Sequence, residues 1–146
     1  MNWNQKGFTL IESLLVLSIF MIISSVTVFT LSPQHSFIER ESFFTQLKAD
    51  LYYAQQYAIS HQHEILVQIV PKEYKYYMIY RAEEKPIIER DYSHNVNFTE
   101  GTMPFTFKFL PDGNINKFGS LILYYRNKIY RLTFLIGEGR FYVSEQ

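Results

Sequence analysis

The chain has 146 residues, and its 14 basic residues balance its 14 acidic ones, so no global field marks it as a nucleic-acid-binding protein. It contains no cysteine, which excludes disulfide bonds, thiol catalysis and cysteine-based zinc or iron–sulfur sites. Aromatic residues make up 18% of the chain and gather after residue 36, which favours a β-rich core.

A short polar stretch, 1–7, precedes a long apolar run. From Leu14 to Leu31 there are eighteen residues without a charge, rich in Leu, Ile, Val, Phe and Met. An α-helix of that length rises about 27 Å, close to the thickness of the hydrocarbon core of a bilayer. The sequence therefore predicts a transmembrane helix over residues 8–31.

One carboxylate, Glu12, lies two residues before the charge-free run. A charge left in lipid costs about 2.5–3.5 kcal/mol on insertion scales, so an acid at this position indicates a function. Two other interpretations of the segment compete. A secretory signal peptide has a shorter apolar core and a small-residue cleavage site, which is missing here. A plain single-pass anchor needs neither Gly7-Phe8 nor Glu12.

The residues Lys6-Gly7-Phe8-Thr9-Leu10-Ile11-Glu12-Ser13 resemble the class III leader of type IV pilins and pseudopilins. The resemblance implies that a membrane-embedded prepilin peptidase cleaves between Gly7 and Phe8 and methylates the new amine of Phe8. It also implies that Glu12 pairs with the terminal amine of a neighbouring subunit when a filament assembles.

Orientation follows from Lys6, whose place on the short side of the apolar run favours that side as cytoplasmic. We therefore expect a single-pass protein of the cell membrane whose C-terminal domain lies outside. After filament assembly the resemblance implies a location at the cell surface.

A second helical segment is predicted over residues 32–62, after Ser32-Pro33, where the proline is expected to kink or interrupt the helix. Its apolar positions are spaced 7, 3, 4, 3 and 4 residues apart, which is the pattern of an amphipathic helix: Phe37, Phe44, Leu47, Leu51, Ala54 and Ala58. The charged and amide residues off this stripe are expected to face water: Glu39, Glu41, Lys48, Asp50, Gln55 and Gln56.

From Glu64 onward the hydrophobic period changes to two, which predicts strands. We expect about six to seven strands, drawn from residues 64–69, 74–81, 86–90, 95–99, 105–109, 121–126, 129–136 and 140–144. Turns are predicted at 71–73, 111–114, 127–128 and 137–139. The predicted fold class is α+β, with the long helix packed on an antiparallel β-domain over residues 63–146.

The layout from Phe109 to Val143, with a glycine-containing turn, a hydrophobic hairpin and a closing Gly-x-Gly-Arg, resembles pseudopilins of the GspH/FimT type. The resemblance implies a pilin-like fold. Together with the KGFTLIESLLVLS start and the length of 146 residues, this ending is similar to a competence minor pseudopilin. That resemblance implies a minor pilin of a competence type IV pilus, required for assembly of the filament that brings transforming DNA across the cell envelope.

The implied partners are other major and minor pilins, the prepilin peptidase, the pilus assembly ATPase and its platform protein, and the membrane. No cofactor is expected. An alternative machine stays open, in which the chain is a minor pseudopilin of a type II secretion system.

Catalytic motifs are missing from the sequence, which contains neither a G-x-S-x-G segment nor a P-loop. His61 and His63 form an H-x-H pair, but a metal site needs three or four ligands, so two exposed histidines are the favoured interpretation. We therefore expect neither an enzyme nor a metal site.

A basic, tyrosine-rich segment runs from Tyr124 to Arg131, and from Lys108 to Arg140 six basic residues face two acidic ones. Basic side chains interleaved with tyrosine can hold phosphates and stack on bases. The candidate DNA contacts are Tyr124, Arg126, Lys128 and Arg131, which would make the chain a DNA-binding receptor subunit. The competing interpretation is an ordinary hairpin whose solvent face is basic.

Overall fold

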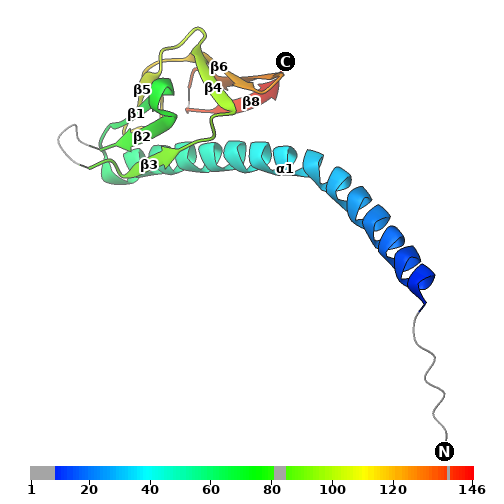
Figure 1. Cartoon of the computed structure of the whole chain (residues 1–146). Coiled ribbons are helices and arrows are strands. Elements are labelled where there is room, and N and C mark those ends of the chain that lie inside the picture. Colours follow the sequence, from blue (N-terminus) through cyan, green and yellow to red (C-terminus); the bar gives the residue numbers. More distant parts are fainter. Residues whose placement is uncertain (1–8, 81–84, 138) are drawn as a thin grey trace, which may run out of the picture. The chain divides into compact units, whose positions relative to one another are not determined.

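The computed structural model describes residues 9–80, 85–137 and 139–146, except for the side chains of 27–36. A long helix is followed by short strands and one 3₁₀ turn (Figure 1). The elements are α1 (Leu10–His61), β1 (Ile65–Val70), η1 (Pro71–Glu73), β2 (Lys75–Ile79), β3 (Ile88–Asp91), β4 (Val96–Glu100), β5 (Thr106–Phe109), β6 (Gly119–Tyr125), β7 (Lys128–Phe134) and β8 (Phe141–Glu145). The predicted α+β class is confirmed, with eight strands in the described part rather than six to seven.

The chain forms two compact units, Met1–Glu41 and Ser42–Gln146. The first contains the N-terminal part of α1, and the second contains the C-terminal part of α1 and all the strands. The helix continues through Ser32-Pro33, so an interruption there is wrong, whereas the alternative expectation, a kink, stays a prediction.

The strands of the second unit form two antiparallel sheets, ordered β3-β2-β1-β5 and β4-β6-β7-β8. On β1, Ile65, Val67 and Ile69 are buried while the residues between them are half-buried, as the period of two predicts. The register places Val67 opposite both Met78 and Phe107, so the inward side chains of neighbouring strands meet in one core.

The C-terminal part of α1 supplies the rest of this core. Five members of the predicted stripe are buried in it: Phe44, Leu47, Leu51, Ala54 and Ala58. The sixth, Phe37, is exposed, so its prediction is wrong. Phe37 belongs to the first unit, and the buried stripe begins only in the segment that shares a unit with the sheets.

Asp50 was expected to face water, but only 4% of it is exposed. Its Oδ2 accepts hydrogen bonds from the Tyr76 hydroxyl on β2 at 2.7 Å and from Arg90 Nε on β3 at 3.1 Å. Its Oδ1 accepts a third from Gln46 Nε2 at 2.8 Å. Burial of a carboxylate is tolerated because these donors replace water. Asp50 therefore ties α1 to the edge of the first sheet.

The Tyr76 hydroxyl is a permanent donor in this network. Burial, and then the hydrogen bond with Asp50, raises the pKa of Tyr76 above its usual range. The proton therefore stays on the Tyr76 hydroxyl throughout the physiological pH range.

Gln55 was also expected to face water and is buried. Its Nε2 donates to the backbone carbonyl of Gly113 at 2.8 Å, joining α1 to the 110–114 turn. Gly139, with a φ of +59°, lies against the same point, and a Cβ there would sit 2.2 Å from the Gly113 carbonyl oxygen. Helix, 110–114 turn and the turn before β8 can meet so closely only because residue 139 has no side chain.

Replacing Asp50 by Ala should lower the free energy of unfolding of the second unit by about 3 kcal/mol, because the buried Tyr76 hydroxyl loses its acceptor. Tyr76→Phe keeps the ring and removes the donor, so it should cost only about 1 kcal/mol. Urea unfolding of the full chain in detergent, followed by near-ultraviolet circular dichroism, measures both values. Equal costs for the two variants would contradict this account of the network.

Gly139→Ala and Gly137→Ala form a matched pair. Both glycines have positive φ, but a Cβ on Gly137 would meet nothing within 4 Å. Gly137→Ala should therefore cost about 1 kcal/mol from backbone strain alone. Gly139→Ala should cost at least about 3 kcal/mol, because the close contacts add to the strain. Thermal unfolding of the two variants side by side gives the comparison, and similar melting temperatures would argue against the close packing.

Candidate functional site

The start of α1 is fixed by Thr9, the residue before the helix. The backbone N–H of Glu12 points to both the hydroxyl of Thr9, at 3.3 Å, and its carbonyl oxygen, at 3.1 Å. Thr9 is thus an N-cap, and Glu12 occupies the third helical position, where a carboxylate interacts favourably with the helix dipole. The T-x-x-E spacing of the leader motif has this local structural cause.

Glu12 is exposed, and no basic group in the described part of the chain forms an ion pair with it. The adjacent hydroxyl of Ser13 donates to the Thr9 carbonyl at 3.3 Å, and Ser18 donates to the Leu14 carbonyl at 2.8 Å. These two serines therefore satisfy their hydrogen bonds within the helix. Glu12 is the one charged group between Leu10 and Val26, and its carboxylate forms no ion pair with the described residues.

The rest of this surface is apolar and exposed on all sides. Every side chain from Leu10 to Val26 is exposed. Ser13, Val16, Leu17 and Phe20 line a shallow hollow along one side of the helix. A helix that is hydrophobic all round needs partners on every side, such as lipid tails or other helices.

Among the described residues, no helical stretch reaches the combined length and hydropathy needed to cross a bilayer. The transmembrane segment predicted over 8–31 stays a prediction. The predicted cleavage and methylation site, Gly7-Phe8, lies outside the described residues.

The hairpin of β6 and β7 does not bring the four candidate DNA contacts onto one face. Tyr124 and Arg131 both point outward from the second sheet, since the residues that alternate with them are buried. Lys128 follows the opposite alternation and pairs with Tyr125. Arg126 lies in the turn, with its guanidinium 5.9 Å from the centre of the Tyr125 ring.

The hairpin turn is displaced by one residue from its predicted place. Arg126 and Asn127 form it, and Lys128 is already the first residue of β7. Arg126 takes the positive φ, +52°, that the tight connection requires. The prediction of an Asn127-Lys128 turn is therefore wrong, because strand register rather than local turn propensity fixes the position.

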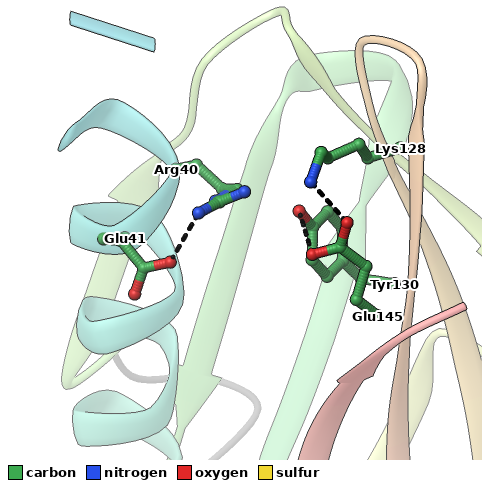
Figure 2. Close-up of polar contacts among 5 residues, drawn as sticks. All are labelled: Arg40, Glu41, Lys128, Tyr130 and Glu145. Atoms are coloured by element: carbon green, nitrogen blue, oxygen red, sulfur yellow. Dashed lines mark hydrogen bonds and ion pairs between the residues drawn. The ribbon is translucent and has the colours of Figure 1, made fainter. Parts of the chain in front are cut away.

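Lys128 forms an exposed ion pair with a strand of its own sheet. Its Nζ donates to Glu145 Oε1 on β8, and the Tyr130 hydroxyl donates to Glu145 Oε2 at 3.2 Å (Figure 2). Figure 2 also shows a separate pair in the first unit, in which Arg40 Nη2 donates to Glu41 at 3.0 Å. Both side chains of the pair are exposed, so the ion pair with Glu145 reduces the phosphate affinity of Lys128 only slightly.

The two histidines at the end of α1 pack on aromatic rings. His61 stacks on Tyr57 with 3.8 Å between ring centres, and His63 stacks on Tyr80 at 5.3 Å. No group of three or more potential metal ligands exists among the described residues. The geometry therefore gives these histidines a packing role.

Tyr142 was not singled out from the sequence, although it points outward from β8 beside the hairpin. Its position opposite Thr133 follows from the register of β7 and β8. In the sequence, the alternation of residues in Phe141-Tyr142-Val143 indicates that Tyr142 lies on the opposite side of the strand from its two neighbours. It could not show which neighbour Tyr142 would meet, because strand order is not encoded locally.

Comparison with known proteins gives a consistent set of matches. A family model described as the prokaryotic N-terminal methylation motif matches residues 4–28. The chain is 32% identical to the competence protein ComGD of Bacillus subtilis (strain 168) over 142 residues, which are 97% of this chain and 95% of that relative.

Two crystal structures of the type IV minor pilin FimU of Pseudomonas aeruginosa (strain PAO1) share the fold. The form in space group P65 matches with a TM-score of 0.59 and 17% identity, over 71% of this chain and 91% of FimU. The form in space group P21 matches with a TM-score of 0.61 and 18% identity, over 74% of this chain and 92% of FimU.

Proposed function

The chain belongs to the type IV pilin and pseudopilin superfamily, in the family of the competence protein ComGD, and from this premise we propose that it is a minor subunit of a competence pilus. The observation that carries the proposal is the surface of α1 from Leu10 to Val26, which is exposed, apolar and marked by one acid, Glu12. Such a surface suits a subunit that is stored in a membrane and then packed among similar helices.

Processing would create the partner that Glu12 lacks. Cleavage between Gly7 and Phe8 would leave a positively charged, methylated amine on Phe8 and make Glu12 the fifth residue of the mature chain. Packed in a bundle, the amine of one subunit would neutralise the carboxylate of the next. Pairing removes the cost of burying either charge alone in an apolar environment.

The remaining steps involve other proteins. A prepilin peptidase would cut the leader, and an assembly ATPase with its platform protein would move the subunit from the membrane into the filament among other major and minor pilins. The second unit would then lie outside the cell membrane. In this role the chain contributes structure to a filament that brings transforming DNA across the envelope, and it carries no catalytic step itself.

A minor pseudopilin of a type II secretion system is the alternative within the same superfamily. The match to a competence protein over 97% of the chain favours the competence pilus. Deleting the gene from its own host would separate the two, because loss of transformation with normal protein secretion supports the pilus.

Replacing Glu12 by Val should reduce recovery of the chain in sheared filaments by about tenfold or more, because the partner amine would be buried without a counter-charge and each 1.4 kcal/mol is tenfold. Membrane insertion should be unchanged. Ser13→Val is the matched control, since it alters the next residue without altering charge, and it should incorporate normally. Normal incorporation of Glu12→Val would contradict the pairing role.

Replacing Gly7 by Val should leave the leader attached, because a side chain at this position obstructs the close approach of the peptidase to the backbone. Intact-mass measurement of the membrane form should then show residues 1–7 retained and no added methyl group. The unaltered chain should begin at a methylated Phe8. An unaltered chain that still carries Met1, or that is trimmed beyond Leu31, would contradict the processing scheme.

A further inference from the structure

The outward side of the second sheet, here called the outer face, differs in composition from the outward side of the first sheet. It consists of the strand residues that alternate with buried ones: Asn97, Thr99, Ser120, Ile122, Tyr124, Ile129, Arg131, Thr133, Tyr142 and Ser144. Leu135 continues the alternation one residue beyond β7, where its N–H donates to the Arg140 carbonyl at 2.8 Å.

Large hydrophobic side chains gather on this face. Tyr124, Ile129, Leu135 and Tyr142 are each 38–48% exposed. Tyr124 lies directly opposite Ile129 across the β6–β7 pair, so two of these side chains are cross-strand neighbours. Contiguous exposed apolar groups on a soluble domain are typical of an interaction surface.

The outward side of the first sheet provides the contrast. Its charges are paired within the sheet: Lys75 Nζ lies 2.7 Å from Glu89 and 3.5 Å from Asp91, and Lys108 Nζ lies 2.7 Å from Glu64. Among the described residues, none of the large hydrophobic side chains on β1, β2, β3 and β5 is exposed. The outward side of the first sheet therefore has the composition of a surface that faces water. The outer face of the second sheet exposes large hydrophobic side chains instead.

Arg131 lies in the middle of the outer face, opposite Ile122 on β6 and Ser144 on β8. It is the only charged residue among the outward strand positions, and it is exposed. No side chain in the described ranges forms a hydrogen bond or ion pair with it. Tyr124 and Tyr142 lie at diagonal positions on the neighbouring strands, and an arginine near tyrosines with no Lys, Asp or Glu at the other outward strand positions is typical of the centre of a protein–protein interface.

We propose that the outer face binds a different pilin subunit, through a mainly neutral protein surface that places one carboxylate against Arg131. This inference rests on the proposed function, because it takes the partner from the same filament. The carboxylate follows from charge complementarity, since a guanidinium desolvated without a counter-ion would weaken binding.

A second copy of this chain fits less well in a face-to-face contact, because its outer face offers no acid to Arg131. Single-stranded DNA also fits less well. Binding along a phosphate backbone draws on several cations, and Arg131 is the only cation among the outward strand positions of this face. A crosslinking experiment distinguishes a second copy of the chain and single-stranded DNA from the proposed partner.

The test places a photo-crosslinking amino acid at Tyr142 of the full chain, produced in its own host with its pilins. Irradiation should join it to a different protein that carries a processed prepilin-type N-terminus, at a peptide containing Asp or Glu. Arg131→Glu should lower the yield of this product at least about tenfold, which corresponds to 1.4 kcal/mol. Changing the partner's acid to Lys should restore the yield in the Arg131→Glu background.

Three controls accompany it. The same crosslinker at Tyr77, on the outward side of the first sheet, should give no such product. Lys72→Glu, an exposed charge reversal on η1, should leave the yield unchanged. Arg131→Lys should keep most of the yield, which separates loss of charge from loss of fold.

An undiminished yield with Arg131→Glu, a product with a second copy of this chain, a product with DNA, or no product would each overturn the inference. Recovery in sheared filaments separates this failure from failure of the proposed function. If only the inference fails, the unaltered chain and Arg131→Glu enter filaments equally. If the proposed function fails, neither enters them.

Discussion

The carboxylate of Glu12, which has no cation beside it on the apolar part of α1, is the main physical constraint on what this chain can do. Between Leu10 and Val26 the only charged residue is Glu12, and every side chain around it is exposed. The hydroxyls of Ser13 and Ser18 donate to carbonyls of the helix backbone, so these two serines need no hydrogen-bond partner outside the helix. Lipid or other helices can cover the apolar groups, but only a cation can make burial of Glu12 inexpensive. In the proposed function, leader cleavage would supply that cation on every subunit, so that filament assembly would also neutralise the charge of Glu12.

The same helix meets a different requirement in the second unit. There, one stripe of small and apolar residues packs into the core, and two polar residues are buried with it. Asp50 and Gln55 each reach a group far away in sequence, the Tyr76 hydroxyl and the Gly113 carbonyl. These bonds fix how the sheets sit on this part of α1. The outward side of the second sheet is thereby presented as a defined surface, with Arg131 among exposed tyrosine and aliphatic side chains.

Local patterns in the sequence predicted most of the fold. The leader motif indicated that the chain belongs to the pilin superfamily. The spacing of Leu47, Leu51 and Ala54 predicted which side of α1 packs into the core, and the hydrophobic period of two predicted the strands. Long-range features escaped prediction. The burial of Asp50 depends on donors from β2 and β3, which no helical pattern reveals. The grouping of Tyr142 with Arg131, and the separation of Lys128 from both, depend on strand register.

The most direct test of the central claim is a structure of the assembled filament that resolves the first residues of neighbouring subunits. We expect the Glu12 carboxylate of one subunit to lie within about 4 Å of the methylated Phe8 nitrogen of an adjacent subunit, in a water-excluded bundle of helices. A Glu12 side chain that faces solvent, or that pairs with a cation of its own chain, would contradict it.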